Sequence, residues 1–283
     1  MAPRHTPSVN QRRFGTELRR LREAVGMSAP VAAERLGVDR TMISNIESGR
    51  FGISEERLRR LASIYECDDF ELINALATMT GGRSKGWWDE YRGKIPPDFL
   101  DVAELEHHAT ALRTLQTAHI PGLFQTEDHA RALFDLFVPA LPRLEVELRI
   151  AHRLARHVVI AGDPGVPYVG LVHETALRMR TGGSRVAKAQ LDHLLEESER
   201  PNVSLHVIPF TAEGFPMAGD TMMYVAAASP HLDTVEVDSP IGAVFFDSPT
   251  QLANFRRRLD LVEQVALNSS ESRDRILEIA RDL

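Results

Sequence analysis

Residues 28–50 read SAPVAAERLGVDRTMISNIESGR, and this stretch decides the fold of the N-terminal part of the chain. Ser28 can cap a short helix that Gly37 ends, and Asp39 can cap the next helix, which covers residues 40–48. Two short helices joined by a turn of three or four residues that contains glycine are typical of a helix-turn-helix. We therefore predict this motif between residues 28 and 50.

The sequence on either side of this stretch predicts three more helices. Apolar residues recur every three or four positions over residues 11–25, which indicates a helix with one apolar face. Ser54 can cap a fourth helix, and a fifth covers residues 68–77. We therefore expect residues 1–77 to form an all-α, five-helix domain.

The helix over residues 40–48 has two different faces. Ile43 and Ile46 lie on the face that points inward, whereas the opposite face is short, polar and able to form hydrogen bonds. In the major groove of DNA, Arg pairs with guanine, Asn pairs with adenine and Thr contacts the thymine methyl group. An ordinary solvated helix face is the alternative. We predict that four residues of this helix read bases, namely Arg40, Thr41, Ser44 and Asn45.

The net charge of −7 conceals two parts of opposite sign. Residues 1–65 hold 12 Arg, no Lys and seven acidic residues, a net charge of +5. The remaining 218 residues hold 21 basic and 33 acidic residues, a net charge of −12. A basic N-terminal domain favours double-stranded DNA as a partner, although the same charge also suits a solvated surface.

The composition excludes several classes of protein. With 43% hydrophobic and 26% charged residues, the chain is typical of a globular protein and not of a disordered one. The longest apolar run, residues 222–228, is much shorter than the roughly 20 residues that cross a bilayer. Cys67 is the only cysteine, and the N-terminal residues lack the apolar core of a signal peptide. We therefore expect a cytoplasmic protein without a membrane partner.

Residues 78–86 are small, polar and rich in glycine, which predicts a linker. Aromatic residues gather directly after it: Trp87, Trp88, Tyr91 and Phe99. We interpret them first as an anchor of the chain onto its own next domain. Contact with a ligand or a partner is the weaker interpretation.

Residues 87–283 predict an α+β domain, because helical stretches alternate with strand-like runs. The strand-like runs are residues 168–173, 203–209, 221–227, 234–237 and 243–247. The helices are expected at residues 101–109, 126–137, 142–157, 185–199, 249–265 and 270–283.

The sequence favours neither a catalytic site nor a metal site. Four histidines between residues 107 and 129 lack the spacing of a metal motif. His173 and Glu174 follow a strand, where catalytic groups often lie, but no nucleophile motif accompanies them. The glycine patterns of nucleotide-binding loops are absent as well. We therefore expect no enzyme, no cofactor and no bound metal.

Three segments of the N-terminal domain resemble the XRE-type, phage-repressor-like helix-turn-helix family: LRRLREAVGMS from residue 18, AERLGV from residue 33 and TMISNIESGR from residue 41. The resemblance covers residues 12–76 and implies that the helix from Arg40 reads bases. It also implies that Glu47 is structural and pairs with an Arg of the first helix. The phosphate contacts expected on this basis, at helix N-termini and beside the reading helix, are Ser28, Arg50, Ser54 and Arg57.

One position departs from that family. The family usually has Gln directly after the Ser28 position, where it contacts a phosphate or a base, and this chain has Ala29. Because that contact is absent, we expect affinity to rest more on Arg40, Asn45 and Arg50.

The second domain resembles the uncharacterised domain that follows an XRE-type domain in many actinomycete regulators, described as antitoxin-like or WhiJ-like. The segments that carry the resemblance are WWDEY from residue 87, PGLFQTEDHAR from 121, VHETAL from 172, QLDHLL from 190 and PNVSLHVIPF from 201. The resemblance implies transcriptional control of a neighbouring gene, commonly one for a small partner protein that this domain binds.

The sequence thus predicts a sequence-specific, antitoxin-like transcriptional regulator that acts as a homodimer and binds a small partner protein. Its two reading helices would contact half-sites roughly 10 bp apart or a multiple of that distance. The alternative is a repressor whose second domain senses a small molecule with Trp87, Trp88 and Phe99. An enzyme with a DNA-targeting domain is less favoured, and would need a catalytic acid such as Glu174.

Overall fold

The structure is a computed structural model that describes residues 6–80, 86–239 and 242–283. It divides into two compact units: Met1–Asp89 with Ala226–Asp233, and Glu90–Val225 with Thr234–Leu283. We call the five-helix part of the first unit the head and the second unit the body. Residues 81–85 of the predicted linker, and residues 1–5 of the predicted first domain, lie outside the described residues.

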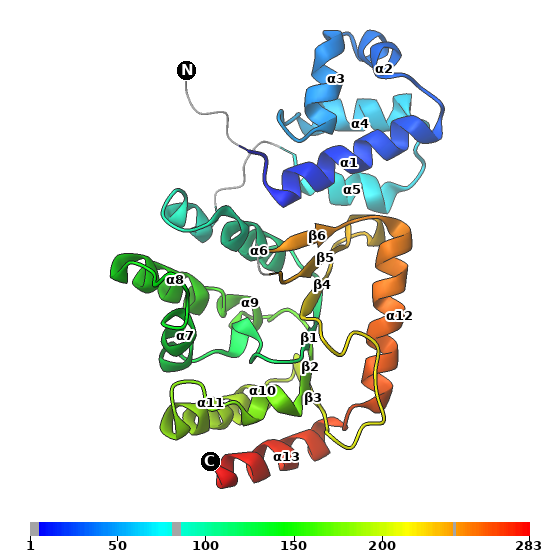
Figure 1. The fold of residues 1–283 in the computed structure, drawn as a ribbon. Helices are drawn as coiled ribbons and strands as arrows, with labels where there is room; N and C mark the ends of the chain where they lie inside the picture. The colour runs from blue at the N-terminus through cyan, green and yellow to red at the C-terminus, as the bar shows by residue number, and fades with distance from the viewer. Residues whose placement is uncertain (1–5, 81–85, 240–241) are drawn as a thin grey trace. The chain divides into compact units, whose positions relative to one another are not determined.

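Five α-helices form the head, as the sequence predicts (Figure 1). They are α1 (Val9–Ala24), α2 (Ala29–Leu36), α3 (Arg40–Glu47), α4 (Glu55–Ile64) and α5 (Phe70–Thr78). The turn between α2 and α3 contains Gly37 at a φ of 76°, a left-handed conformation that glycine adopts without strain. Asp39 then caps α3 by accepting a hydrogen bond from the Thr41 amide. The helix-turn-helix geometry is therefore confirmed.

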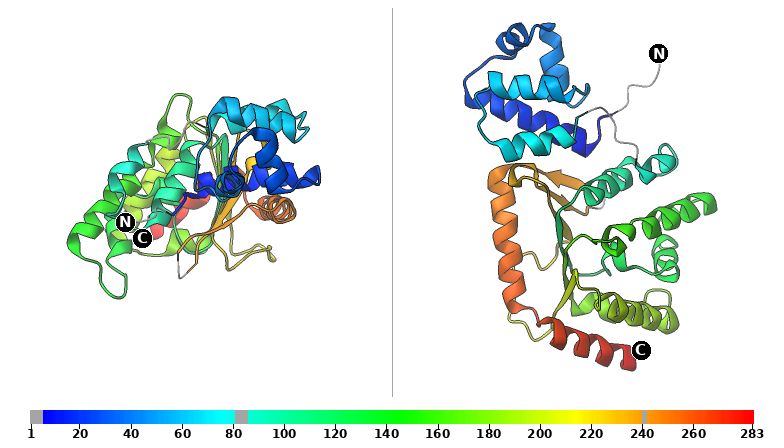
Figure 2. Two further views of the ribbon diagram at one scale, coloured as in Figure 1. Left: turned by 90° about the horizontal axis from the view of Figure 1, so that it is seen from above. Right: turned by 180° about the vertical axis from the view of Figure 1, so that it is seen from behind.

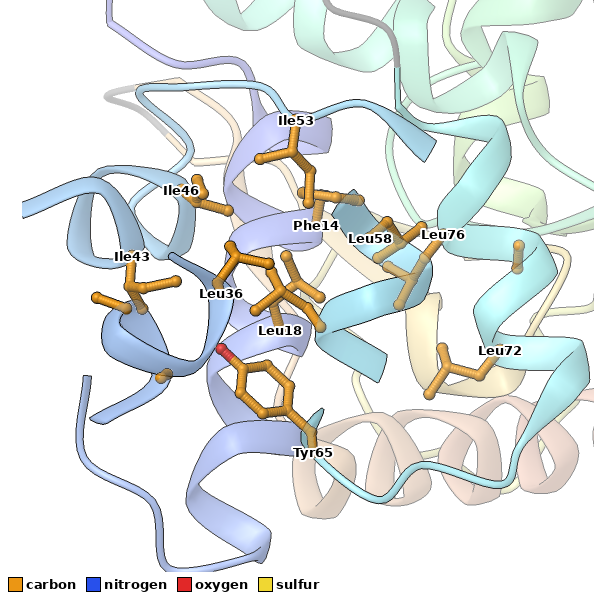
Figure 3. Close-up of a cluster of buried hydrophobic side chains, with 14 of the residues drawn as sticks. Phe14, Leu18, Leu36, Ile43, Ile46, Ile53, Leu58, Tyr65, Leu72 and Leu76 are labelled. Carbon is orange, nitrogen blue, oxygen red and sulfur yellow. The ribbon is translucent and has the colours of Figure 1, made fainter. Parts of the chain in front are cut away.

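The helices of the head surround one apolar core (Figure 3). Phe14 and Leu18 of α1 lie at its centre, and Ile43 and Ile46 bring the apolar face of α3 against them. The first unit also includes the short helix η3 (Pro230–Leu232), whose Leu232 joins the same cluster. Burial of the apolar face of α3 leaves its polar face at the surface.

A six-stranded sheet in the order β3-β2-β1-β4-β5-β6 forms the centre of the body. Its strands are β1 (Ala111–Gln116), β2 (Tyr168–His173), β3 (Val203–Ile208), β4 (Met222–Ala226), β5 (Thr234–Val237) and β6 (Val244–Phe246). β2 pairs in parallel with both β1 and β3, whereas β5 pairs antiparallel with both β4 and β6. The parallel strands need long crossover connections, and helices supply them.

Helices cover both faces of this sheet. Figures 1 and 2 show α12 along one face and α6 to α11 on the other. The helices of the body are α6 (Pro97–His107), α7 (Glu127–Phe134), α8 (Arg143–Ala155), α9 (Val158–Ala161), α10 (Glu174–Arg178), α11 (Ser184–Glu197), α12 (Pro249–Val265) and α13 (Ser269–Asp282). Within the described part of the chain, no helix combines the length and the apolar composition that crossing a bilayer requires. The layout of an all-α domain followed by a domain of mixed helices and strands is confirmed.

One strand of the sheet is absent from the sequence prediction. β1 contains Arg113 and Gln116, which favour helices, and its only β-branched residue is Thr114. Its pairing with β2 is what makes it a strand, and the Thr114 hydroxyl lies 2.6 Å from the Tyr168 hydroxyl. The local pattern is weak because a distant segment supplies the hydrogen-bond partners.

Candidate nucleic-acid interface

The four predicted base-reading residues lie together on α3. Arg40, Thr41 and Ser44 are exposed, and Asn45 is partly exposed. They occupy the side of the helix opposite the buried Ile43 and Ile46, so the structure presents them as one polar surface, which we call the α3 face. Their contact with bases remains a prediction.

Asp39 organises the start of the α3 face. Its Oδ1 accepts hydrogen bonds from the Thr41 amide at 2.8 Å and the Thr41 hydroxyl at 2.7 Å. These two bonds, with a smaller contribution from the charge of Arg40, lower the pKa of the Asp39 carboxyl. Because the Thr41 hydroxyl is engaged in this way, its methyl group is the part suited to contact a thymine.

The segment after α3 is tied to the end of the helix. The Asn45 carbonyl accepts hydrogen bonds from the Arg50 amide at 2.9 Å and the Phe51 amide at 3.2 Å. Gly49 makes this return possible with a φ of 73°. These hydrogen bonds fix the position of the backbone at the exposed Arg50 relative to the α3 face.

α1 packs against α3 through a close backbone contact and an ion pair. A Cβ atom at Gly15 would lie 2.5 Å from the Glu47 carbonyl oxygen, so only glycine allows the two helices this close. The Arg22 guanidinium donates to both carboxylate oxygens of Glu47, at 2.6 and 2.9 Å. Both side chains are less than one tenth exposed. The pairing of Glu47 with an Arg of the first helix is thus confirmed, whereas Gly15 was not anticipated from the sequence.

The two helix N-termini predicted to bind phosphate differ. Ser54 caps α4 by accepting a hydrogen bond from the Arg57 amide at 3.4 Å, and Glu55 and Glu56 follow in the first turn. Ser28 occupies the N-cap position of α2, but its side chain makes no capping hydrogen bond there, so a side-chain cap at this position is not observed. Pro30 removes the amide N–H of the second helical position, whereas Val31 keeps that of the third, the position whose amide Ser54 accepts from in α4.

This difference affects anion binding. The partial positive charge of a helix N-terminus favours an anion, and acidic residues beside it oppose one. The first turn of α2 contains no acidic residue, whereas that of α4 contains Glu55 and Glu56. Ser28, whose hydroxyl does not cap its own helix, is therefore the better placed of the two serines; Ser54 and Arg57 are exposed but lie beside two carboxylates.

The four aromatic residues after the linker are divided between the two units. Trp87 and Trp88 belong to the first unit and pack edge to face at 5.9 Å, with Trp88 buried. Tyr91 and Phe99 belong to the body, where both rings pack against His152 at 5.1 and 6.1 Å.

The body contains buried charges that sequence reasoning missed. Arg156, directly after α8, donates to both carboxylate oxygens of Glu106 on α6, at 2.8 and 2.5 Å, and Glu106 has no exposed surface. Burial, and then the nearby charge of Asp238, raise the pKa of the Glu236 carboxyl. No sequence signal links Arg156 with Glu106, because they lie 50 residues apart in separate parts of the body.

Comparison with known families agrees with this division of the chain. A helix-turn-helix domain matches residues 13–76, which suggests DNA-binding regulation. A domain of unknown function (DUF5753) matches residues 99–278, more than half of the chain. No curated protein and no solved structure matches significantly. The chain therefore belongs to the DUF5753 family and carries a helix-turn-helix domain before the family domain.

Proposed function

We propose that the chain is a sequence-specific transcriptional regulator of the XRE type whose α3 face reads base edges in the major groove. The observation that carries this proposal is the α3 face itself, with Arg40, Thr41, Ser44 and Asn45 gathered on one exposed side of a helix whose other side is buried. Arg40 and Asn45 have the side chains that pair with guanine and adenine. Residues 1–65 supply the +5 charge that draws the head toward DNA.

Phosphate contacts set the register of the head on the duplex. Arg50 is exposed directly after α3, and Ser28 lies at the acid-free N-terminus of α2. Ser54 and Arg57 would contribute less, because Glu55 and Glu56 oppose a phosphate at that end of α4. Such contacts strengthen binding to all sequences and carry no sequence information directly.

Genome-wide chromatin binding followed by footprinting tests the proposal. At the site so identified, Arg40→Ala should remove about 1–3 kcal/mol of preference for the contacted base. Arg59→Ala is the matched control, because Arg59 is an exposed arginine of α4 that pairs with Glu55, outside the α3 face. An unchanged footprint and affinity in Arg40→Ala and Asn45→Ala would refute base reading by α3.

Arg50→Ala tests the phosphate role separately. Loss of one phosphate contact should weaken binding to specific and non-specific DNA alike, and should reduce the slope of log affinity against log salt by about 1. If Arg50→Ala changed base preference and left the salt slope intact, its role would be base reading instead.

The body acts in the same proposal as an antitoxin-like, partner-binding domain. The connection between α7 and α8, together with the first turn of α8, exposes large apolar side chains, which is typical of an interaction surface: Leu136 (71% exposed), Val138 (95%) and Leu144 (72%). The expected partner is a small protein encoded by a gene next to the one for this chain. In copurification from cells that express both, Val138→Asp should abolish capture, whereas Leu277→Asp on α13 should not. Equal capture by both variants would place the partner elsewhere.

The regulator is proposed to bind DNA as a homodimer without enzymatic activity. Two heads would protect half-sites roughly 10 bp apart or a multiple of that distance. The sensing of a small molecule by the aromatic residues has less support, because Trp88 is buried and Tyr91 and Phe99 pack on His152. Light scattering of the complex with its DNA site gives the number of chains bound, and one chain per site would contradict the dimer.

A further inference from the structure

Three potential metal ligands lie close together in the body, on α11 and in the segment directly after α8. His157 follows the end of α8, and His193 and Glu197 lie one turn apart on α11. Each of the three offers one ligand atom, and these atoms all lie within 4.8 Å of one another. The His157 Nε2 atom is 3.0 Å from the Glu197 Oε2 atom, so the imidazole already points at the carboxylate.

The donor set and its burial suit a divalent transition-metal ion. Two imidazoles and one carboxylate are the three protein ligands of many zinc sites, in which the fourth position stays open to water or another ligand. The Glu197 side chain is 8% exposed, while those of His157 and His193 are 30% and 28% exposed. An ion can therefore approach from solvent and reach a carboxylate that folding has already withdrawn from most of its water.

We propose that His157, His193 and Glu197 bind one divalent transition-metal ion of the zinc type. The ion would take the place of the hydrogen bond between His157 and Glu197, with His157 as the tautomer that carries its proton on Nδ1. It would join the segment after α8 to α11, two parts of the body that are distant in sequence.

The surrounding charges are compatible with this site. Glu196 Oε2 lies 3.8 Å from His193 Nδ1, so a small movement would let it accept that N–H and leave Nε2 for the metal. Arg200 contacts Glu197 through Nε at 2.5 Å from Oε2 and Nη2 at 3.3 Å from Oε1. When Oε2 coordinates the metal, Arg200 can remain on Oε1. Its Nε hydrogen bond to Oε2 and its positive charge both compete with a cation at this carboxylate.

Zinc titration of the metal-free, full-length chain by calorimetry tests the site. We expect one zinc ion per chain, and a loss of affinity of at least about 100-fold in His157→Ala and in His193→Ala, because even changes outside the ligands cost about 10- to 100-fold. Both histidines are partly exposed, so circular dichroism should show that these variants still fold. Glu197→Gln, which keeps the size of the buried side chain, should have a similar effect.

The matched control removes two histidines that would also attract metal. His107 and His108 are adjacent, exposed and 4.9 Å apart between ring centroids, so the double variant His107→Ala/His108→Ala detects adventitious binding. We expect this variant to bind zinc as the original chain does. Loss of binding in the double variant, retention in His157→Ala and His193→Ala, or no binding by the original chain would each overturn the proposal.

Arg200→Gln and thermal melting give a second readout. Removal of the competing guanidinium should leave zinc affinity equal or higher. If the Glu197–Arg200 ion pair were instead needed to fold this part of the body, Arg200→Gln would lose zinc affinity. Zinc should also raise the melting temperature of the original chain and of the double variant, since a ligand that binds only the folded state stabilises it. The same melting temperature with zinc and with chelator in the original chain would contradict a metal that joins these helices.

Discussion

The head and the body both bury ionisable side chains, but of different kinds. In the head, arginines such as Arg40 and Arg50 stand at the surface, and two ion pairs are buried, Arg13–Glu17 within α1 and Arg22–Glu47 between α1 and α3. The body buries histidines as well as charged pairs, among them His129 and His152. The head therefore keeps part of its arginine charge at the surface, whereas the body contains buried imidazoles whose protonation is opposed by burial. The net charge of a domain does not reveal this difference, because it does not show which groups are buried.

The largest expected effect tests the ion pair between α1 and α3 in the head. Glu47→Gln leaves the Arg22 charge buried without a carboxylate, which should lower the free energy of unfolding of the head by about 3 kcal/mol. Hydrogen exchange resolved by peptide should show the loss of protection in α1 and α3 while the body keeps its protection. Glu55→Gln is the matched control, because the exposed pair of Glu55 with Arg59 contributes little. If hydrogen exchange in α1 and α3 rose equally in both variants, the buried pair would contribute no more to stability than the exposed pair.

The next effect concerns acid, and it should separate the body from the head. Burial, followed by neighbouring arginine charges, lowers the pKa of His152 to about 3, and burial lowers that of His129 to about 4. Below pH 6.5 these two histidines bind protons in the unfolded chain but stay neutral in the folded body. Stability should thus be full above about pH 6.5 and should fall by up to about 1.4 kcal/mol per pH unit for each histidine as pH drops toward 4.

Urea unfolding at several pH values checks this dependence. His152→Phe removes one titrating group and keeps an aromatic ring beside Tyr91 and Phe99, so its stability should change less steeply between pH 6.5 and 4. Residues 6–80 contain no histidine, and the protection of the head against hydrogen exchange should change less over the same range. A steeper loss in the head than in the body would reverse the comparison.

The smallest effect compares two serines within the head. Ser54→Ala removes the side-chain cap of α4 and should lower the free energy of unfolding by about 1 kcal/mol. Ser28→Ala removes a hydroxyl that makes no capping bond, so it should leave stability nearly unchanged and should weaken DNA binding. Thermal melts and binding titrations on both variants test the pair. A melting temperature that falls equally in both would contradict the difference in capping.

Much of the head could be predicted from the sequence because its signals act over a few residues. Gly37 and Gly49 provide the left-handed backbone that ends each short helix, and Asp39 caps α3 from two residues away. The α3 face follows from helical periodicity alone. The Ser28 cap was predicted by the same reasoning, with Pro30 accepted in the first turn, but the side chain of Ser28 makes no capping hydrogen bond.

The body could be predicted only in outline. Six of its helices and five of its strands were expected from the sequence, whereas the short helices α9 and α10 were not, and β1 becomes a strand only by pairing with β2. The ion pair of Arg156 with Glu106, and the cluster of His157 with His193 and Glu197, join elements that are distant in the chain. The spacing of His193 and Glu197 is visible in the sequence, but nothing in the sequence indicates that His157 lies beside them.

The sequence by itself determined the five helices of the head, the turn, the polar α3 face and the opposite charges of the two parts, since each depends on residue type and short-range spacing. The tertiary structure alone decided how closely α3 lies on α1, where Gly15 meets Glu47, and which strand completes the sheet. It also decided which charged groups are buried. These features depend on contacts between residues far apart in the chain, and burial changes the energy of a charge more than its position in the sequence can indicate.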